Sequence, residues 1–411
     1  MKTIKSLKAS PVTDTPPADR LLEAVQAAWP PLGRANMTAR QISQTAEVQT
    51  SQINYYFGNF EQLLASAQAQ SMIAAQIWCD RQLSQTDGLP AIAPEGFGAM
   101  MAALIDDWTV TQRPHAFAWR ECQMMAARDD TFAPLARQWR DIWKAFWDDM
   151  CARMGFGAYA DITRQFFDGE SFLHRITWRR ALDRACLTET CQGWARLLTT
   201  SRAGDGALRH FARLESEKLT TPIIAHGSIA EQIAEAAAMI VGRFGAAAVT
   251  HRAVARESGV NLGAVTYHFP TSDTLMHAAW INIYLRLTRN VVRDENEPYT
   301  HQQFKDNLIH FVQKPALVED LLGMEELMSA SARADDLNGV GAMIRYSRGR
   351  STYHGLSRMI SPLGPLGAQD AALISNWTQG LRRDLMVLPA DEALSGAHHT
   401  IDQIVALLRV E

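Results

Sequence analysis

The sequence predicts an all-α protein built from two tandem units, and three observations support this. First, one helix-turn-helix pattern occurs twice, and the two copies align without a gap. Second, the chain has 411 residues, which gives each unit about 200 residues, enough to enclose a hydrophobic core. Third, large apolar residues elsewhere recur at helical spacing, as Trp139, Trp143 and Trp147 do. The residue pairs of the repeat, each 212 positions apart, are Thr38/Thr250, Ile42/Val254, Val48/Val260, Ile53/Val265, Tyr55/Tyr267, Phe57/Phe269 and Leu63/Leu275.

Each copy begins with a helix, predicted over Leu21–Trp29 in the first copy and over Gln232–Phe244 in the second. Pro30-Pro31 is expected to end the first helix, because proline lacks a backbone N–H and its ring clashes with the preceding turn. A glycine, Gly33 or Gly245, lies just beyond each helix. Glycine is the residue that most often ends a helix in a left-handed conformation.

A threonine opens the second helix of each copy. The side-chain oxygens of Thr38 and Thr250 can accept hydrogen bonds from the first free N–H groups of the helix. In the first copy, Thr38 and Gln41 have the spacing of a capping box. Arg40 and Arg252 follow directly, at a helix N-terminus that can meet a phosphate.

A short third helix follows the turn, over Gln49–Tyr55 or Asn261–Tyr267. Val48 and Ile53 are expected to bury one side of it, and polar residues cover the other side. A tight corner between two helices with a polar second helix is the geometry that places the second helix in the major groove of DNA.

Residues Thr38 to Leu63, and more closely residues Thr250 to Leu275 with SGVNLGAVTYHFPTSDTL, resemble the DNA-binding domain of TetR-family transcriptional regulators. The resemblance implies a three-helix head, a connecting fourth helix and a C-terminal ligand-binding domain that dimerises through its last two helices. It also implies double-stranded DNA as a partner. Contacts to the DNA backbone are then expected from Thr38, Thr250, Tyr55, Tyr267, Tyr56 and His268. Base contacts are expected from Gln49, Thr50, Gln52 and Asn54 in the first copy and from Asn261, Leu262, Ala264 and Thr266 in the second.

The first copy departs from the family pattern in its turn. Glu47 stands where the family usually has glycine, and a left-handed backbone there costs a non-glycine residue about 1 kcal/mol. The second copy keeps Gly259 at that place. Phe60 and Ser272 replace a lysine that the family often places near a phosphate. The second copy is therefore the stronger candidate for binding DNA.

The repeat extends more weakly to the ends of both units. Gly169 corresponds to Gly380, 211 positions later. Helices around 161–182, 189–200, 369–387 and 399–409 are candidates for an internal four-helix bundle. The predicted organisation is a disordered tail (1–20), a first head (21–66), a first regulatory domain (67–201), a linker (202–228) with a short helix near Ala207–Lys218, a second head (229–278) and a second regulatory domain (279–411).

Nine of the eleven tryptophans lie in the first unit. Trp108, Trp119, Trp143 and Trp178 are candidates for a pocket that binds an apolar or aromatic effector. The alternative is that the tryptophans simply pack the core. The five cysteines have no metal-ligand spacing and are expected to be reduced thiols. We expect no metal site and no cofactor.

The sequence thus predicts a cytoplasmic, ligand-responsive transcriptional regulator, most simply a repressor, in which one chain acts as a monomeric pseudo-dimer. No apolar run suggests a membrane span and no catalytic motif suggests an enzyme. The alternative is a sensor of small molecules or protein partners whose heads no longer bind DNA. Its support is that positive and negative charges cancel within each head and that the first turn contains Glu47.

Overall fold

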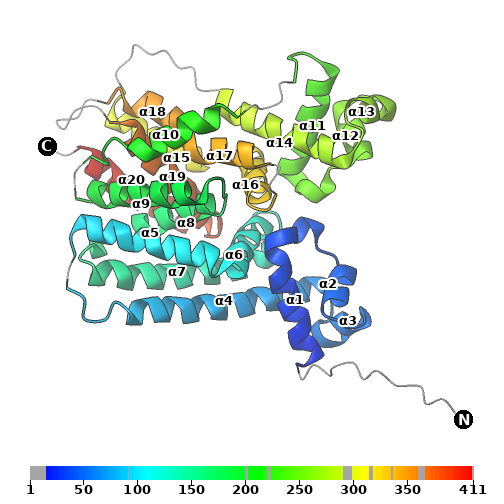
Figure 1. Cartoon of the computed structure of the whole chain (residues 1–411), viewed down its shortest axis with the longest axis horizontal. Helices are drawn as coiled ribbons and strands as arrows, with labels where there is room; N and C mark the ends of the chain where they lie inside the picture. The colour runs from blue at the N-terminus through cyan, green and yellow to red at the C-terminus, as the bar shows by residue number, and fades with distance from the viewer. Residues whose placement is uncertain are drawn as a thin grey trace, which may run out of the picture.

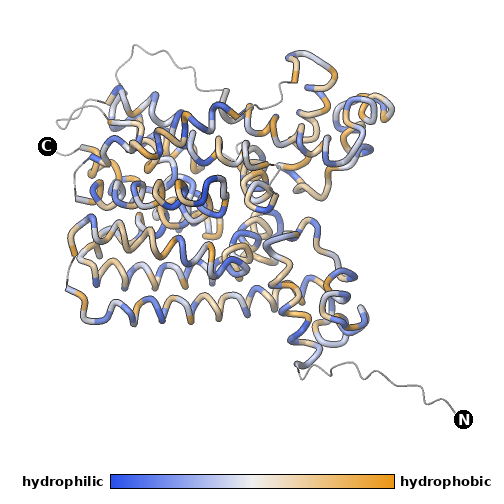
Figure 2. The backbone as a smooth tube through the Cα atoms, viewed as in Figure 1, coloured by the Kyte–Doolittle hydropathy of each residue, from blue (hydrophilic) through white to orange (hydrophobic). Residues whose placement is uncertain are grey.

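The computed structural model describes residues 15–90, 92–199, 202–219, 224–289, 299–313, 318–334, 337–359 and 366–409. Within these ranges the protein contains helices and connecting turns and no strand, so the predicted all-α class is confirmed. Hydrophilic and hydrophobic residues alternate along the helices of the body, as expected of helices that bury one face (Figure 2).

The helices of the first half are α1 (Pro17–Leu32), α2 (Ala39–Thr45), α3 (Ser51–Phe57), α4 (Phe60–Ser84), α5 (Pro94–Val110), α6 (Arg113–Ala126), α7 (Ala133–Arg153), α8 (Ala160–His174) and α9 (Arg180–Leu197). Helix α10 (Ala207–Glu217) lies in the predicted linker. The helices of the second half are α11 (Ile229–Phe244), α12 (His251–Ser258), α13 (Leu262–His268), α14 (Ser272–Arg289), α15 (His301–Gln313), α16 (Val318–Ser331), α17 (Asn338–Tyr346), α18 (Arg350–Leu356), α19 (Ala368–Met386) and α20 (Ala390–Arg409). The 3₁₀ turns are η1 (Arg34–Asn36), η2 (Asp130–Phe132), η3 (Gly157–Tyr159) and η4 (Ala246–Ala248).

Two three-helix heads lie on the same side of a larger helical body (Figure 1). Helices α1–α3 form the first head and α11–α13 form the second. In the first half, the long helix α4 leads from the head into the body, where α5, α7, α8 and α9 lie in neighbouring layers (Figure 1). Helix α6 packs against α1, and α16 packs against α11. These two helices therefore connect the body to the heads.

Helix α1 is longer than predicted at both ends. It begins at Pro17, so the last four residues of the predicted 1–20 tail are helical, and residues 1–14 lie outside the described part. It also continues through Pro30 and Pro31 to Leu32, so the expected end at Trp29 is wrong. The φ of proline is compatible with a helix, and the two missing N–H groups leave the carbonyls of Gln26 and Ala27 without their usual helical donors. The helix ends at Gly33, which has φ 62°, and α11 ends likewise at Gly245, which has φ 83°.

The turn between the second and third helix differs between the heads. The predicted capping box is confirmed, because the Thr38 side chain accepts from the Gln41 N–H and Gln41 accepts from the Thr38 N–H. The chain then passes through Glu47 with φ 54°, the only described non-glycine residue with a positive φ. In the second head Gly259 takes this conformation, with φ 70°. The predicted left-handed turn is thus present in both heads, and only the first head makes it with a side chain.

Helices α3 and α13 begin slightly later than predicted, at Ser51 and Leu262. Asn261 precedes α13 and caps it by accepting from the Ala264 N–H at 2.8 Å. Thr50 precedes α3 and makes no side-chain cap. Ile53 and Val265 are buried under the third helix of each head.

The body of the first half is packed around tryptophans. Trp78, Trp108, Trp139, Trp143, Trp147 and Trp194 are all buried. The Trp143 ring lies 4.8 Å from the Trp108 ring and 4.9 Å from the Trp119 ring, measured between centroids. The stripe at 139, 143 and 147 lies on the buried face of α7.

The two halves meet where α8 crosses α19. Almost every residue of both helices is buried. A Cβ atom on Gly169 would overlap the backbone carbonyl of Asn376, and a Cβ atom on Gly380 would overlap the backbone carbonyl of Gln165. The crossing is thus closest at the two glycines that the sequence paired. The Trp377 ring N–H donates to the Gln165 side chain at 2.8 Å.

Charged residues also join the two helices. The Arg164 guanidinium donates to Asp384 at 2.8 Å, and Arg383 donates to Asp168 at 2.5 Å. Helix α9 lies against α19, and α20 lies against α8. The bundle expected near 161–182, 189–200, 369–387 and 399–409 is therefore centred on one helix pair, α8 and α19, with α9 and α20 outside it.

Replacing Gly169 by alanine is expected to lower the free energy of unfolding by about 3 kcal/mol or more, because the new Cβ must push α8 away from α19. The matched control is Gly396→Ala in α20, where the nearest atom to the new Cβ lies at 3.5 Å. That change should leave stability equal or raise it by about 0.5–1 kcal/mol. Chemical denaturation measures both. Equal stability of the Gly169→Ala protein would contradict the close crossing.

Replacing Glu47 by glycine is expected to raise the free energy of unfolding by about 1 kcal/mol, because glycine adopts φ 54° without steric cost. Gly259→Ala should lower it by a similar amount, and open space around Gly259 means that the effect comes from the backbone alone. Thermal unfolding of both variants provides the test. A loss of stability in Glu47→Gly would show that the Glu47 side chain stabilises the first head.

Candidate nucleic-acid interface

The predicted DNA contacts lie on α2, α3 and their turn in the first head, and on α12, α13 and their turn in the second. These helices form the outer side of each head (Figure 1). Most of the predicted residues are exposed, namely Thr38, Arg40, Gln49, Thr50, Asn54, Tyr55, Tyr56, Thr250, Arg252, Asn261, Leu262, Thr266, Tyr267 and His268. Gln52 and Ala264 are half-buried.

Tyr55 and Tyr267 occupy equivalent positions at the C-terminal half of the third helix. Their exposed fractions are 80% and 81%. A tyrosine this exposed contributes little to the core of its own head. Its hydroxyl and ring are available to a partner, which fits the expected contact with a DNA backbone.

The N-terminus of the second helix differs in what it offers a phosphate. The Thr38 hydroxyl accepts from the Gln41 N–H and also donates to the Gln41 side chain at 2.8 Å. The Thr250 hydroxyl accepts from the Ala253 N–H at 3.1 Å. Its proton is not used by a described residue, so Thr250 keeps a donor for a phosphate oxygen and Thr38 does not.

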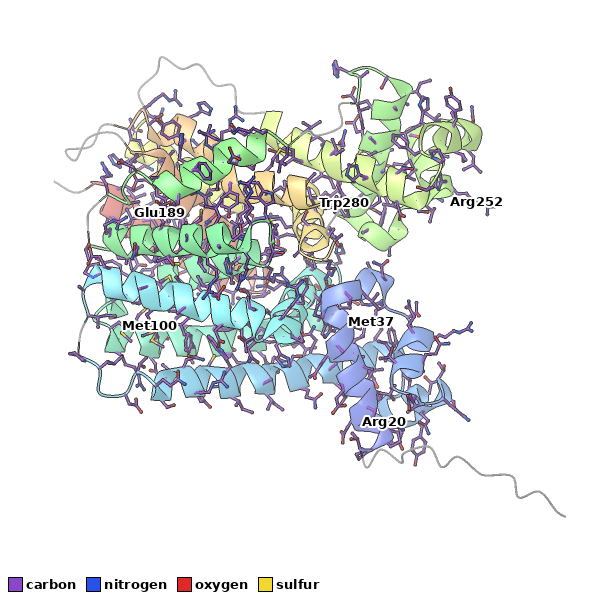
Figure 3. All side chains as sticks on the ribbon, viewed as in Figure 1. Arg20, Met37, Met100, Glu189, Arg252 and Trp280 are labelled. Carbon is purple, nitrogen blue, oxygen red and sulfur yellow. The ribbon has the colours of Figure 1, made fainter. Side chains whose placement is uncertain are left out.

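The exposed arginines at these helix ends are unpaired. Arg40 and Arg252 form no ion pair with a described residue, and Arg252 lies at the outer end of the second head (Figure 3). By contrast, Arg34 pairs with Glu61 at 2.6 Å and Arg243 pairs with Glu257 at 3.0 Å. The positive and negative charges that balance in each head are thus partly paired with one another beside the interface, which leaves Arg40 and Arg252 without an ion-pair partner among the described residues.

The base-reading candidates of the two heads differ in their free hydrogen-bonding groups. Gln49 and Asn54 have side chains without a described hydrogen bond. Asn261 uses its Oδ1 as the helix cap, and Thr266 donates its hydroxyl proton to the Leu262 carbonyl at 3.0 Å. The Asn261 Oδ1 thus already accepts one hydrogen bond, and its side-chain NH₂ has no described partner.

Two arginines cross from one half to the head of the other. Arg333, just after α16, donates from Nε to the Pro30 carbonyl at 3.1 Å and forms an ion pair with Glu121 on α6. The Glu121 carboxylate also accepts from the Arg34 backbone N–H at 2.9 Å. We call this set, Arg333, Glu121 and the end of α1, the first clasp.

The second clasp has the same form with the halves exchanged. Arg128, just after α6, pairs with Glu326 on α16 at 2.8 Å and donates to the Val241 carbonyl of α11 at 3.4 Å. Arg333 reaches the equivalent carbonyl of Trp29 at 3.5 Å. Burial raises the pKa of Glu326, although Arg128 opposes this. The clasps connect the end of each head's first helix to both α6 and α16.

A cleft of about 780 Å³ lies between the heads. Residues of η1 and η4 form two of its walls, and Trp280 of α14 lies on it (Figure 3). Both clasps line this cleft. A change in the clasps would therefore alter the space that separates the two heads.

The tryptophans predicted to form a ligand pocket do not line this cleft or the smaller pocket between α6, α16 and α19. Trp108, Trp119 and Trp143 are buried against one another, and Trp178 is half-buried beside Tyr346. This placement matches the alternative of core packing.

Sequence reasoning missed the clasps. The sequence gives little indication of them, because Glu121 and Arg333 are ordinary charged residues until helix packing brings them together.

All five cysteines are free and buried, and burial chiefly raises the pKa of the Cys186 thiol to about 11. Among the described residues, no cluster of histidine, cysteine and acidic side chains could hold a metal ion. In the same ranges no helix is long and apolar enough to cross a membrane.

Residues 233–279 match the family described as "Bacterial regulatory proteins, tetR family". The matched segment runs from α11 into the start of α14, so it contains the second head and its exposed residues. No curated protein matches the chain. The helices, the turn at Gly259 and this match together support a DNA-binding transcriptional regulator of the TetR family.

Proposed function

We propose that the chain is a ligand-responsive transcriptional regulator, acting as a repressor in the cytoplasm, in which two unlike heads bind one asymmetric operator. The observation that carries the proposal is the pair of exposed helix-turn-helix surfaces on one side of one body. The second head is supported by its family match, and the first head is assigned from its own residues.

The helix pair α8 and α19 supports an internal pseudo-dimer. Its close crossing uses residues of both halves of one chain, so the surface that a separate subunit would need is already filled. Association within a chain occurs at a high effective concentration. The proposed active species is therefore a monomer with two heads.

The clasps support a link between body and heads. Arg333 and Arg128 each contact the other half's head and a glutamate of the other half's connecting helix. A ligand that moves α6 relative to α16 changes both clasps together. Ligand occupancy and DNA affinity are then linked, each changing the other by the same factor.

The competing function is a sensor of small molecules or protein partners that does not bind DNA. Titration with DNA distinguishes this sensor from a regulator. Fragments from the gene's own promoter region are titrated at a stated salt concentration, because affinity falls steeply with salt. Binding at least about 10³-fold tighter than to unrelated DNA supports the regulator. Affinity equal to that for unrelated DNA would overturn it in favour of the sensor.

The unlike third helices predict an operator that is not a palindrome. Selection from a random pool should yield two different half-sites in a fixed orientation, with one chain bound per duplex by light scattering. Gln52→Ala with Asn54→Ala should relax one half-site by about 1–3 kcal/mol per lost bidentate contact. Asn261→Ser with Thr266→Val should relax the other half-site while keeping the α13 cap.

The control for these variants is Glu23→Ala, an exposed position on α1 away from the third helix. It should leave both half-sites unchanged. Recovery of a palindrome bound by two chains would mean that each chain uses one head, and the pseudo-dimer would be wrong.

A further inference from the structure

A small pocket lies inside the body, between α6, α16 and α19. Its polar residues are Arg120, Gln123, Glu325, Gln379, Arg382 and Arg383. Three guanidinium groups thus share one pocket with a single carboxylate. No tryptophan lines the pocket, although the Arg120 guanidinium lies 3.9 Å from the centroid of the Trp119 ring.

The acidic groups near the pocket are already used. Asp168 accepts from Arg120 at 2.7 Å and from Arg383 at 2.5 Å. Glu325 accepts from the Nη1 of Arg383 at 2.6 Å. Both carboxylates are buried and both already accept from a guanidinium group.

Two of these guanidinium groups have N–H donors that no described acceptor uses. The Nη2 of Arg383 is buried without a hydrogen-bond partner. Arg382 is only 6% exposed and donates no hydrogen bond to a described residue. Burial chiefly lowers the pKa of Arg382 to about 10; Glu325 opposes this shift and the neighbouring Arg383 adds to it. A buried donor without an acceptor, such as Nη2 of Arg383, is costly, and a bound anion would supply the acceptor.

We propose that this pocket binds an oxyanion, either free or as the head group of an acid with a short apolar tail. A guanidinium presents two parallel N–H groups that match the two oxygens of a carboxylate or phosphate. Arg382 is the principal ligand and Arg383 the second. Met124, Leu322 and Val387 provide an apolar wall beside them, which suits the tail.

The size of the pocket limits the ligand. Its enclosed volume is about 20 Å³, which is room for about one water-sized group. One oxygen of an oxyanion fits there, and the rest of the ligand lies at the open side. This pocket therefore does not suit the aromatic effector among the tryptophans that the sequence predicts.

The pocket adjoins both clasps along the chain. Arg120 precedes Glu121 of the first clasp, and Glu325 precedes Glu326 of the second. An anion competes with Glu325 for Arg383 and alters the charges between α6 and α16. The effect on DNA rests on the proposed function, whereas anion binding by itself does not.

The test measures binding to the full chain without DNA. Sodium phosphate and sodium octanoate are the probes, in a buffer low in chloride, followed by thermal unfolding and calorimetry. One probe at least should raise the unfolding midpoint by about 2–4 °C at saturating concentration. Phosphate alone identifies a free oxyanion, and octanoate alone identifies an acid with a tail. No shift with either probe would overturn the site.

Arg382→Gln is the diagnostic variant and Arg137→Gln, at an exposed position of α7, is the matched control. Arg382→Gln should fold with an equal or higher midpoint without anion, because a largely buried cation that makes no described hydrogen bond is removed. Its anion Kd should rise at least about tenfold. Arg382→Lys keeps the charge but not the two parallel donors, so its anion Kd should lie between those of the unchanged protein and Arg382→Gln. Unchanged affinity in Arg382→Gln would overturn the assignment.

A separate arm measures DNA affinity with and without the bound probe. A change of about threefold or more supports the coupling through the clasps. If the anion binds but DNA affinity is unchanged, the anion site is supported and its regulatory role is overturned. If the anion binds but the protein has no specific DNA binding, the anion site is supported and only the proposed function is overturned.

Discussion

The crossing of α8 and α19 is the constraint on which the rest of the structure depends. Glycine at 169 and 380 lets two backbones approach so closely that side chains beyond the crossing interlock. The Trp377–Gln165 hydrogen bond and the Arg164–Asp384 pair form on either side of that contact. Ion pairs join α6 and α16 to this pair, Arg120 with Asp168 and Arg383 with Glu325. The ends of α6 and α16 lie close enough to the opposite heads for Arg128 and Arg333 to reach them. The spacing between the heads is thus connected to a contact deep in the body.

The interior at this crossing is polar, which is unusual for a helix pair that is almost fully buried. Arg120, Asp168, Arg383 and Glu325 form a continuous chain of ion pairs. Burying such groups costs free energy that their mutual attraction only partly repays, so the chain adds little to stability. The chain affects how the helices align, because a misalignment that separates one ion pair leaves an uncompensated buried charge. The helices consequently have one satisfactory alignment, which a purely apolar contact would not enforce.

Local features of this fold could be predicted from the sequence, and distant ones could not. The caps at Thr38 and Thr250, the helix ends at Gly33 and Gly245 and the left-handed Glu47 each depend on neighbouring residues. Pro30-Pro31 was misleading because a distant contact holds this end of the helix: Arg333 from the other half donates to the Pro30 carbonyl. The clasps and the arginine pocket depend on helices about 200 residues apart, so no pattern within one segment reveals them. The tryptophan stripe predicted burial correctly, yet spacing alone does not separate a packed core from a pocket.

The separation of the crossing partners has a consequence for synthesis. Gln165 and Trp377 are 212 positions apart, and a ribosome adds about 5–20 residues each second. Helix α8 therefore leaves the ribosome about 10–40 seconds before the helix that covers it exists. During that interval Arg164, Gly169 and Phe172 lack their native contacts with α19. The first half must wait in a partly folded form, and a nascent chain stalled before residue 368 would be a natural substrate for chaperones.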